Sequence, residues 1–141
     1  LVIEQKKPFL GICVGMQILA NSSQEFGHVA GLGWIDGQVN SLATLPPVLR
    51  VPHVGWNNVQ VTDLAPEFYS LNNKDFYFVH SFYFSAAAKS VMATVDYGVE
   101  FACMVRKNNI FGVQFHPEKS AVSGKQFFLE YFKTIGCFAK C

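Results

Sequence analysis

Hydrophobic and polar residues alternate along this chain mostly at strand spacing, with helical spacing near its two ends. Phe9–Ile12 is a short apolar run after Pro8, which is the length of a buried strand. Val14–Ala20 then continues with helical spacing, and Ser123–Ile135 forms a second helical pattern. On that second helix we expect one packing face made of Phe128, Phe132 and Ile135, with Phe127 and Tyr131 beside it.

The middle of the chain is rich in short strand patterns. Asn21–Gly33 has the composition of a loop, Pro46-Pro47 marks a break, and Pro66–Leu71 predicts a short helix. Asn108-Asn109 is typical of a hairpin turn. The expected strands are Trp34–Leu42, one or two strands within Val48–Thr62, Phe76–His80, Phe82–Phe84, Val91–Tyr97, Phe101–Val105 and Ile110–Phe115. A helix near each end and strands between them predict an α/β fold, with one mixed sheet flanked by helices.

The composition narrows the functional classes. Half of the 141 residues are hydrophobic and 15% are charged, which excludes a disordered chain. The net charge of +1 comes without a clustered basic face, so we expect no nucleic-acid partner. No apolar stretch reaches 18 residues, so we expect no membrane span. Lys6, Lys7 and Pro8–Ala20 imitate a signal peptide, but Gly11, Gly15 and Gln17 interrupt that run.

The cysteines do not predict a disulfide framework. Their sequence contexts differ, and this favours free thiols in a cytoplasmic protein: Cys13, Cys103, Cys137 and Cys141. His28, His53 and the pair Cys137 and Cys141 match no familiar metal-ligand spacing, so we expect no metal and no cofactor.

Gly11-Ile12-Cys13-Val14-Gly15 follows the first predicted strand and opens a predicted helix. A nucleophile elbow at such a junction needs small residues two positions before and two after the nucleophile, because the backbone is crowded there. The start of the helix would also lower the pKa of the Cys13 thiol. Taken alone, the pattern fits a small buried cysteine equally well.

A second candidate group follows the last predicted strand, at Phe115-His116-Pro117-Glu118. A thiol nucleophile needs a base, and the base needs a third group that fixes its tautomer and orientation. His116 and Glu118 supply both from one turn. Taken alone, His116 is more typical of a surface or core histidine, but together with Cys13 the set reads as nucleophile, base and orienting acid.

These two segments resemble the signatures of the class I glutamine amidotransferases, in the residues PFLGICVGMQ and GVQFHPEKS. The resemblance implies a three-layer, flavodoxin-like fold and hydrolysis of glutamine to glutamate and ammonia. Cys13 would be the nucleophile, His116 the base and Glu118 the orienting acid. The N–H of Val14 would contribute to the oxyanion hole.

A narrower resemblance, to the HisH-type amidotransferase subunit of imidazole glycerol phosphate synthase, rests on VPHVGWN at 51–57 and His80-Ser81-Phe82. It covers 7–136. It implies that Gln17 and Glu25 bind the amino-acid end of glutamine, and that His80, Ser81 and Phe82 line the same pocket. Phe82 replaces the usual tyrosine, which removes a hydroxyl but would leave a role of the backbone intact.

The same resemblance implies a partner, a HisF-type cyclase subunit that uses the ammonia to make imidazole glycerol phosphate in histidine biosynthesis. Trp56, Asn57 and Lys119 are the interface candidates. Three alternatives stay open: a HisH-like subunit for another amidation, another class I amidotransferase, and a catalytically silent module. Without the resemblance, we would interpret Gln17 as a solvated helix residue, Glu25 as a loop acid and Trp56 as a core residue.

The resemblance also implies further strands before the elbow strand, including a loop that supplies a second oxyanion donor. Only Leu1–Lys7 precede that strand here. We therefore expect 1–141 to be a partial amidotransferase domain, from the elbow strand onward, with little activity by itself.

Overall fold

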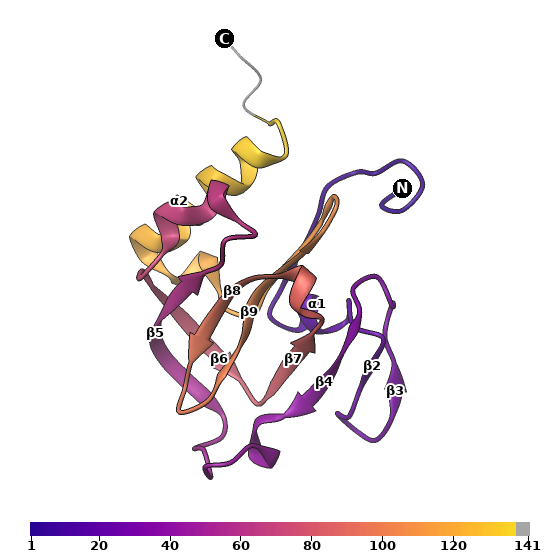
Figure 1. Ribbon diagram of the computed structural model, residues 1–141, viewed down its shortest axis with the longest axis vertical. Helices are drawn as coiled ribbons and strands as arrows, with labels where there is room; N and C mark the ends of the chain where they lie inside the picture. The colour runs from indigo at the N-terminus through magenta and orange to yellow at the C-terminus, as the bar shows by residue number, and fades with distance from the viewer. Residues whose placement is uncertain (138–141) are drawn as a thin grey trace.

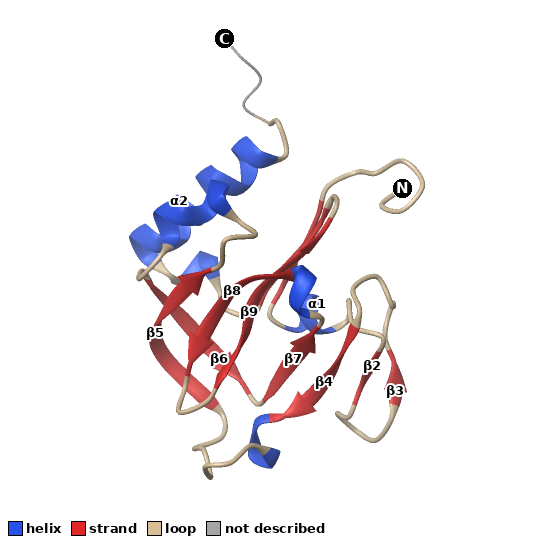
Figure 2. Cartoon of the chain, in the orientation of Figure 1, coloured by secondary structure: helices blue, strands red, loops and turns tan. Residues whose placement is uncertain are grey.

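The computed structural model describes residues 1–137 and contains two sheets (Figures 1 and 2). The large sheet has the strand order β1-β10-β9-β8-β5-β6. Its strands are β1 (Phe9–Ile12), β5 (His53–Val61), β6 (Asp75–His80), β8 (Val91–Asp96), β9 (Glu100–Lys107) and β10 (Ile110–Val113). The β1–β10 pair is parallel and the other pairs of this sheet are antiparallel, so the predicted mixed sheet is confirmed.

The small sheet has the order β3-β2-β4-β7. It is formed by β2 (Ser22–Ser23), β3 (Val29–Ala30), β4 (Gly37–Ser41) and β7 (Phe82–Ala86). The stretch expected as a loop, Asn21–Gly33, therefore contains two very short strands. β2 pairs with β3 and β4, whereas β3 pairs with β2, so these strands depend on tertiary pairing and the local sequence pattern does not predict them.

Two α-helices and four 3₁₀ segments complete the described fold. The α-helices are α1 (Val14–Gln17) and α2 (Ala121–Thr134), and the 3₁₀ segments are Leu42–Thr44, Pro66–Leu71, Ala88–Ser90 and Pro117–Lys119. Helix α1 ends at Gln17 rather than at the expected Ala20.

Two hydrophobic clusters lie on opposite sides of the large sheet. Helix α2 and the segment Pro66–Leu71 cover one side, with Phe68, Phe127 and Tyr131 buried against Phe111. The other cluster joins α1, the small sheet and the large sheet. This gives three layers, in which a second sheet and one helical turn form the outer layer opposite α2 (Figure 1).

The buried face of α2 differs in detail from the expected one. Phe127 and Tyr131 are its buried centre, whereas Phe132 is 38% exposed. Phe128 and Ile135 are partly buried at the edge of the cluster. The expected face was therefore centred too far toward Phe132, because which side of the helix meets the sheet is decided by tertiary contacts.

Candidate active site

Cys13 lies at the sharp turn between β1 and α1, with a backbone φ of 53° and ψ of −111°. A positive φ is disfavoured for a residue with a side chain, and such conformations concentrate at functional sites. The N–H of Cys13 donates to the carbonyl of Val113 over 2.8 Å, which ties the turn to the end of β10. The turn thus presents the Cys13 side chain at the edge of the large sheet.

The two glycines around Cys13 contribute unequally. A Cβ at Gly11 would lie 2.1 Å from the carbonyl oxygen of Gly15, so any side chain at position 11 would force the strand and the helical turn apart. A Cβ at Gly15 would meet no described atom within 4 Å. The steric reason expected for both glycines therefore applies to Gly11 and not to Gly15 among the described residues.

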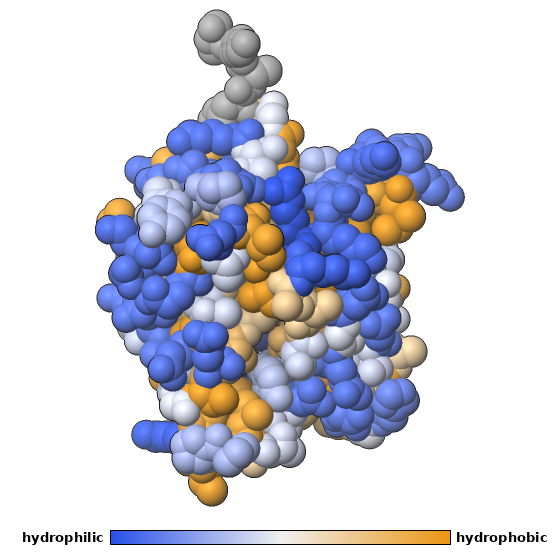
Figure 3. Space-filling model, in the orientation of Figure 1, coloured by the Kyte–Doolittle hydropathy of each residue, from blue (hydrophilic) through white to orange (hydrophobic). Residues whose placement is uncertain are grey.

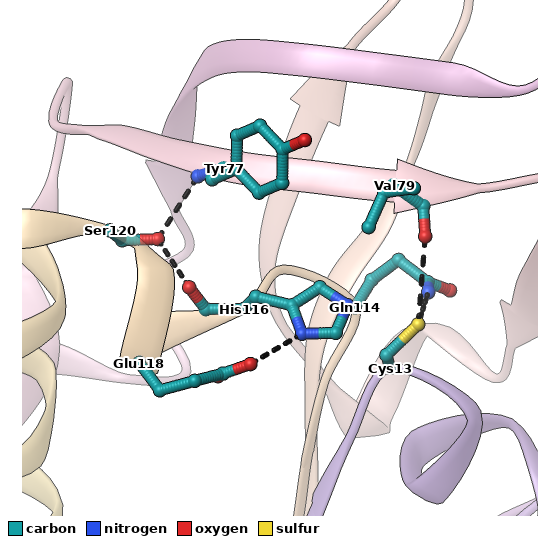
Figure 4. Close-up of polar contacts among 7 residues, drawn as sticks. All are labelled: Cys13, Tyr77, Val79, Gln114, His116, Glu118 and Ser120. Atoms are coloured by element: carbon teal, nitrogen blue, oxygen red, sulfur yellow. Dashed lines mark hydrogen bonds and ion pairs between the residues drawn. The ribbon is translucent and has the colours of Figure 1, made fainter.

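Two hydrogen bonds hold the Cys13 thiol. Its Sγ donates to the carbonyl oxygen of Val79 over 3.7 Å, and the amide Nε2 of Gln114 donates to Sγ, also over 3.7 Å (Figure 4). Val79 belongs to β6 and Gln114 follows β10, so the nucleophile is fixed by two strands of the large sheet.

Burial raises the pKa of the Cys13 thiol above its ordinary value, and the nearby Glu118 carboxylate adds to this effect. The N–H of Val14, the Gln114 amide and the Lys119 ammonium oppose it without cancelling it. The expected lowering of the thiol pKa is therefore wrong. Helix α1 is a single turn, and the cost of desolvating the thiolate outweighs the stabilisation that its N-terminus gives. A thiol of raised pKa is protonated at neutral pH, so nucleophilic attack needs a base.

Glu118 orients the imidazole ring of His116, because the Glu118 Oε1 lies 2.6 Å from the ring Nδ1. Because the carboxylate accepts, Nδ1 carries the proton in the neutral ring and Nε2 is the free acceptor. In Figure 4 the imidazole extends from Glu118 toward Cys13. No hydrogen bond joins Cys13 to His116 within 1–137. Hydrogen bonds between base and nucleophile often tighten only in the reacting complex.

The turn that carries His116 is clamped to β6 and to α2. Ser120 Oγ donates to the carbonyl of His116 over 2.6 Å and accepts from the N–H of Tyr77 over 3.0 Å (Figure 4). The N–H of His116 donates to the carbonyl of Tyr77 over 2.9 Å. A Cβ at Gly124 would lie 1.8 Å from the carbonyl oxygen of Pro117, so this glycine lets α2 pack directly on the turn.

A cavity of about 210 Å³ lies beside the elbow and includes both residues that the resemblance assigned to substrate binding. Glu25 contributes a partly buried carboxylate. The Oε1 of Gln17 takes no hydrogen bond from any described residue, whereas its Nε2 donates twice. The full lining is Val14, Gln17, Ile18, Ser23, Glu25, Phe26, Val29, Ala30 and Gly31.

His80, Ser81 and Phe82 do not line this cavity. Both ring nitrogens of the buried His80 are engaged, Nδ1 with the Phe82 carbonyl at 2.7 Å and Nε2 with His53 Nδ1 at 2.9 Å. Burial lowers the pKa of His80 to about 4. The Phe82 carbonyl also accepts from Gln17 Nε2 over 2.9 Å, and the Ser81 carbonyl accepts from the N–H of Leu42. A contact of these three residues with glutamine stays a prediction, and the segment supports Gln17 through the backbone carbonyl of Phe82.

The three interface candidates differ in how far their side chains are exposed. The Trp56 side chain is 53% exposed and contacts Tyr77 edge to face, and Lys119 is exposed. The Asn57 side chain instead turns inward, with Oδ1 2.8 Å from His53 Nε2. Successive side chains of a strand point to opposite faces, so the side chains of Trp56 and Asn57 leave β5 in different directions. The role of Trp56, Asn57 and Lys119 at a partner interface stays a prediction.

Sequence reasoning missed Gln114, the fully buried residue that bonds the nucleophile. The expected strand Ile110–Phe115 includes Gln114, whereas the observed strand β10 ends at Val113. The available signal was a lone polar residue inside an otherwise apolar run, two positions before His116. A buried amide must find hydrogen-bond partners, so such a residue marks a polar site inside the fold.

Residues 1–137 contain neither a metal-binding cluster nor a helix that could span a membrane. No group of three or more His, Cys, Asp or Glu side chains there is arranged to hold a metal ion. None of the helices in this part of the chain is long and apolar enough to cross a membrane. Cys103 is buried and Cys137 exposed, both as free thiols, and Cys141 lies outside the described residues.

Residues 1–134 match the family model "Glutamine amidotransferase class-I". The chain belongs to the class I glutamine amidotransferases. Two solved glutamine amidotransferases, one of them from Thermotoga maritima, share the fold with TM-scores of 0.61 and 0.63 at 18% identity. They cover 96% and 90% of this chain, which covers 51% and 60% of theirs.

Curated relatives confirm the resemblance to the HisH type. This amidotransferase chain is 47% identical over 124 residues to imidazole glycerol phosphate synthase subunit HisH 2 of Vibrio vulnificus, which covers 87% of the chain. It is 44% identical over 137 residues to the HisH subunit of Moorella thermoacetica, covering 96% of the chain. The subunit of Leptospira interrogans is 48% identical over 130 residues and covers 88%. The chain spans 58%, 62% and 62% of these three relatives.

Proposed function

We propose that this chain carries the glutaminase site of a HisH-type amidotransferase, which hydrolyses glutamine to glutamate and ammonia. The observation that carries the proposal is the pairing of a strained Cys13 elbow with a His116 ring already oriented by Glu118 at 2.6 Å. A buried thiol without an oriented base would fit a silent module equally well.

The geometry supports a thioester mechanism. His116 Nε2 takes the thiol proton as Cys13 Sγ attacks the side-chain amide carbon of glutamine. In this mechanism the Val14 N–H, which interacts with the sulfur, stabilises the oxyanion. The imidazolium then returns the proton to the departing ammonia as the C–N bond breaks, and the product is a glutamyl thioester. Water, deprotonated by His116, hydrolyses this thioester to glutamate and restores the thiol.

The cavity beside the elbow supports the choice of substrate. A free amino acid presents an ammonium group, which needs acceptors. Glu25 offers a carboxylate and Gln17 an unused amide oxygen on the same cavity, next to Val14. We therefore propose that the α-ammonium group of glutamine lies between Gln17 and Glu25, with its side chain directed at Cys13.

We further propose that the ammonia passes to a HisF-type cyclase subunit in histidine biosynthesis, within the cytoplasm. The relatives are named as subunits of imidazole glycerol phosphate synthase. The exposed Trp56 and Val54 of β5 offer apolar contacts to such a partner, and the exposed Lys119 offers a charge beside the site. On the face shown in Figure 3, hydrophilic side chains separate the hydrophobic areas, so this face offers no single large hydrophobic patch to a partner.

An assay of glutamate release by the full protein, with and without a HisF-type subunit, tests this function. We expect release with the partner and its loss in Cys13→Ala, with Cys103→Ala as the matched control thiol. Incorporation of ¹⁵N from amide-labelled glutamine into imidazole glycerol phosphate tests the pathway. Release without incorporation would favour another amidation, and no release in either condition would favour the silent module.

A further inference from the structure

Gln114 has a fully buried side chain in which both polar atoms have a hydrogen-bond partner. Its backbone N–H donates to the carbonyl of Cys103 over 2.9 Å, which fixes its position just beyond β10. Its amide Oε1 accepts from Gln17 Nε2 over 3.0 Å, and its own Nε2 donates to Cys13 Sγ over 3.7 Å. The side chain thus spans the distance between a cavity residue and the nucleophile.

The direction of this amide is dictated by its neighbours. Gln17 Nε2 carries two hydrogens and donates both, one to Gln114 and one to the carbonyl of Phe82. The Phe82 carbonyl is only an acceptor, so Gln17 must present its NH₂ group to both partners. Gln114 must therefore turn its oxygen to Gln17 and its NH₂ to Cys13, because a flipped amide would place two donors against each other.

This direction favours the reactive form of the thiol. When Cys13 loses its proton, the hydrogen bond to the Val79 carbonyl is lost and that oxygen repels the sulfur. The Gln114 N–H, in contrast, becomes a charge-assisted donor to the thiolate. The Val79 carbonyl therefore favours the resting thiol, and the Gln114 amide favours the thiolate.

We infer that Gln114 is a positioning residue that holds the Cys13 sulfur and links it, through Gln17, to the cavity beside the elbow. The link rests on the proposed function, since it assumes that the ligand of the cavity is glutamine. A donor from that ligand to the free Oε1 of Gln17 would polarise both amides in turn and strengthen the N–H bond to the sulfur.

The first test measures the Cys13 thiol directly. Alkylation by iodoacetamide is followed against pH in the full protein, with peptide-resolved mass spectrometry to separate Cys13 from the exposed Cys137. In Gln114→Met, which keeps the shape and removes the donor, we expect the midpoint to rise by about one pH unit, or about tenfold slower alkylation below it. Gln114→Glu should raise the midpoint further, because a carboxylate faces the sulfur.

Gln126→Met on α2 is the matched control and should leave the Cys13 profile unchanged. If Gln114→Met fails to fold, Gln17→Met provides the second variant, because it frees the Gln114 amide to rotate and should raise the midpoint by a smaller amount. An unchanged midpoint in folded Gln114→Met, or in Gln17→Met where the first variant does not fold, would overturn the inference.

The second test measures coupling with glutamine turnover. We expect Gln114→Met to lower kcat about tenfold with little change in KM, whereas Gln17→Met also raises KM. The double variant should lose less than the product of the two single losses, because one bridge is broken twice. Multiplicative losses would contradict the bridge. The alkylation profile needs no glutamine, so it decides the role of Gln114 even if the protein hydrolyses none.

Discussion

The nucleophile and its base are held in place by opposite physical means. The Cys13 turn requires a glycine at position 11, because the Gly15 carbonyl occupies the space that a Cβ of residue 11 would take. The His116 turn depends mainly on hydrogen bonds of the Ser120 hydroxyl, which accepts from the Tyr77 N–H and donates to the His116 carbonyl. The first arrangement fails when volume is added, and the second when a polar group is removed. Steric and hydrogen-bonding variants should therefore separate the two halves of the site.

The largest effect should come from Gly11→Ala. Its Cβ would lie 2.1 Å from a backbone oxygen, which cannot move without opening the elbow. We expect a loss of at least about 3 kcal/mol in the free energy of unfolding. Gly15→Ala is the matched control, since its Cβ meets no described atom, and should change stability by less than about 1 kcal/mol. Urea unfolding of both variants measures this, and equal losses would show that the elbow is not limited by volume.

Acid should weaken the support behind the elbow. The pKa of His80 is lowered to about 4 in the folded chain, mainly by burial, with its ordinary value at 6.5. The unfolded state therefore binds a proton that the folded state refuses between these values, so stability is lost as the pH falls from 6.5 to 4. The difference corresponds to about 3 kcal/mol.

Urea unfolding at several pH values measures this loss. The variant His80→Gln should be less stable at neutral pH but should show a flatter dependence on pH. The exposed His28→Gln is the control and should keep the dependence of the original protein. A dependence that persists in His80→Gln would place the acid-sensitive group elsewhere.

A smaller effect is expected on the other side of the site. Ser120→Ala removes the donor to the His116 carbonyl and the acceptor for the Tyr77 N–H, both in a buried position. We expect about 2 kcal/mol less stability. The pH profile of Cys13 alkylation should stay unchanged, because the variant touches the base and not the thiol. A shifted profile would mean that the two turns are not held separately.

The smallest effect should come from Lys119→Ala. The exposed ammonium lowers the pKa of Cys13 slightly and makes no ion pair in the described part of the chain. Stability should be unchanged, and Cys13 alkylation below its midpoint should slow by less than about threefold. Added salt should remove the difference. Insensitivity to salt would assign the change to something other than charge.

The order and kind of the main elements could be predicted from local pattern, because strands such as β6 and β10 carry their own hydrophobic signal. Phe76–His80 was expected, and Asp75–His80 is observed. The short strands Ser22–Ser23 and Val29–Ala30 could not be predicted, since they exist only through pairing of the first with β4 and of the second with the first. The length of α1 was also set by tertiary structure, because Leu19 and Ala20 pack in the core outside the helix.

The candidate site was predictable where one residue type implies one chemistry. Cys13, His116 and Glu118 carry such types: Cys13 directly follows β1, and the other two lie at the 3₁₀ segment after β10. Whether a polar side chain faces a cavity, a partner or the interior is a matter of strand phase and neighbours. For this reason the sequence pattern did not predict that Asn57 and His80 both contact His53, and the buried Gln114 was overlooked.

Phe82 supports the elbow through its backbone carbonyl and not through its aromatic ring. Gln17 and His80 both meet its main-chain oxygen, while its ring packs with the second hydrophobic cluster. Evolution can therefore exchange one aromatic ring for another there, with or without a hydroxyl, and leave the support of the elbow intact. The demand on this position is for a strand residue of suitable bulk rather than for a particular functional group.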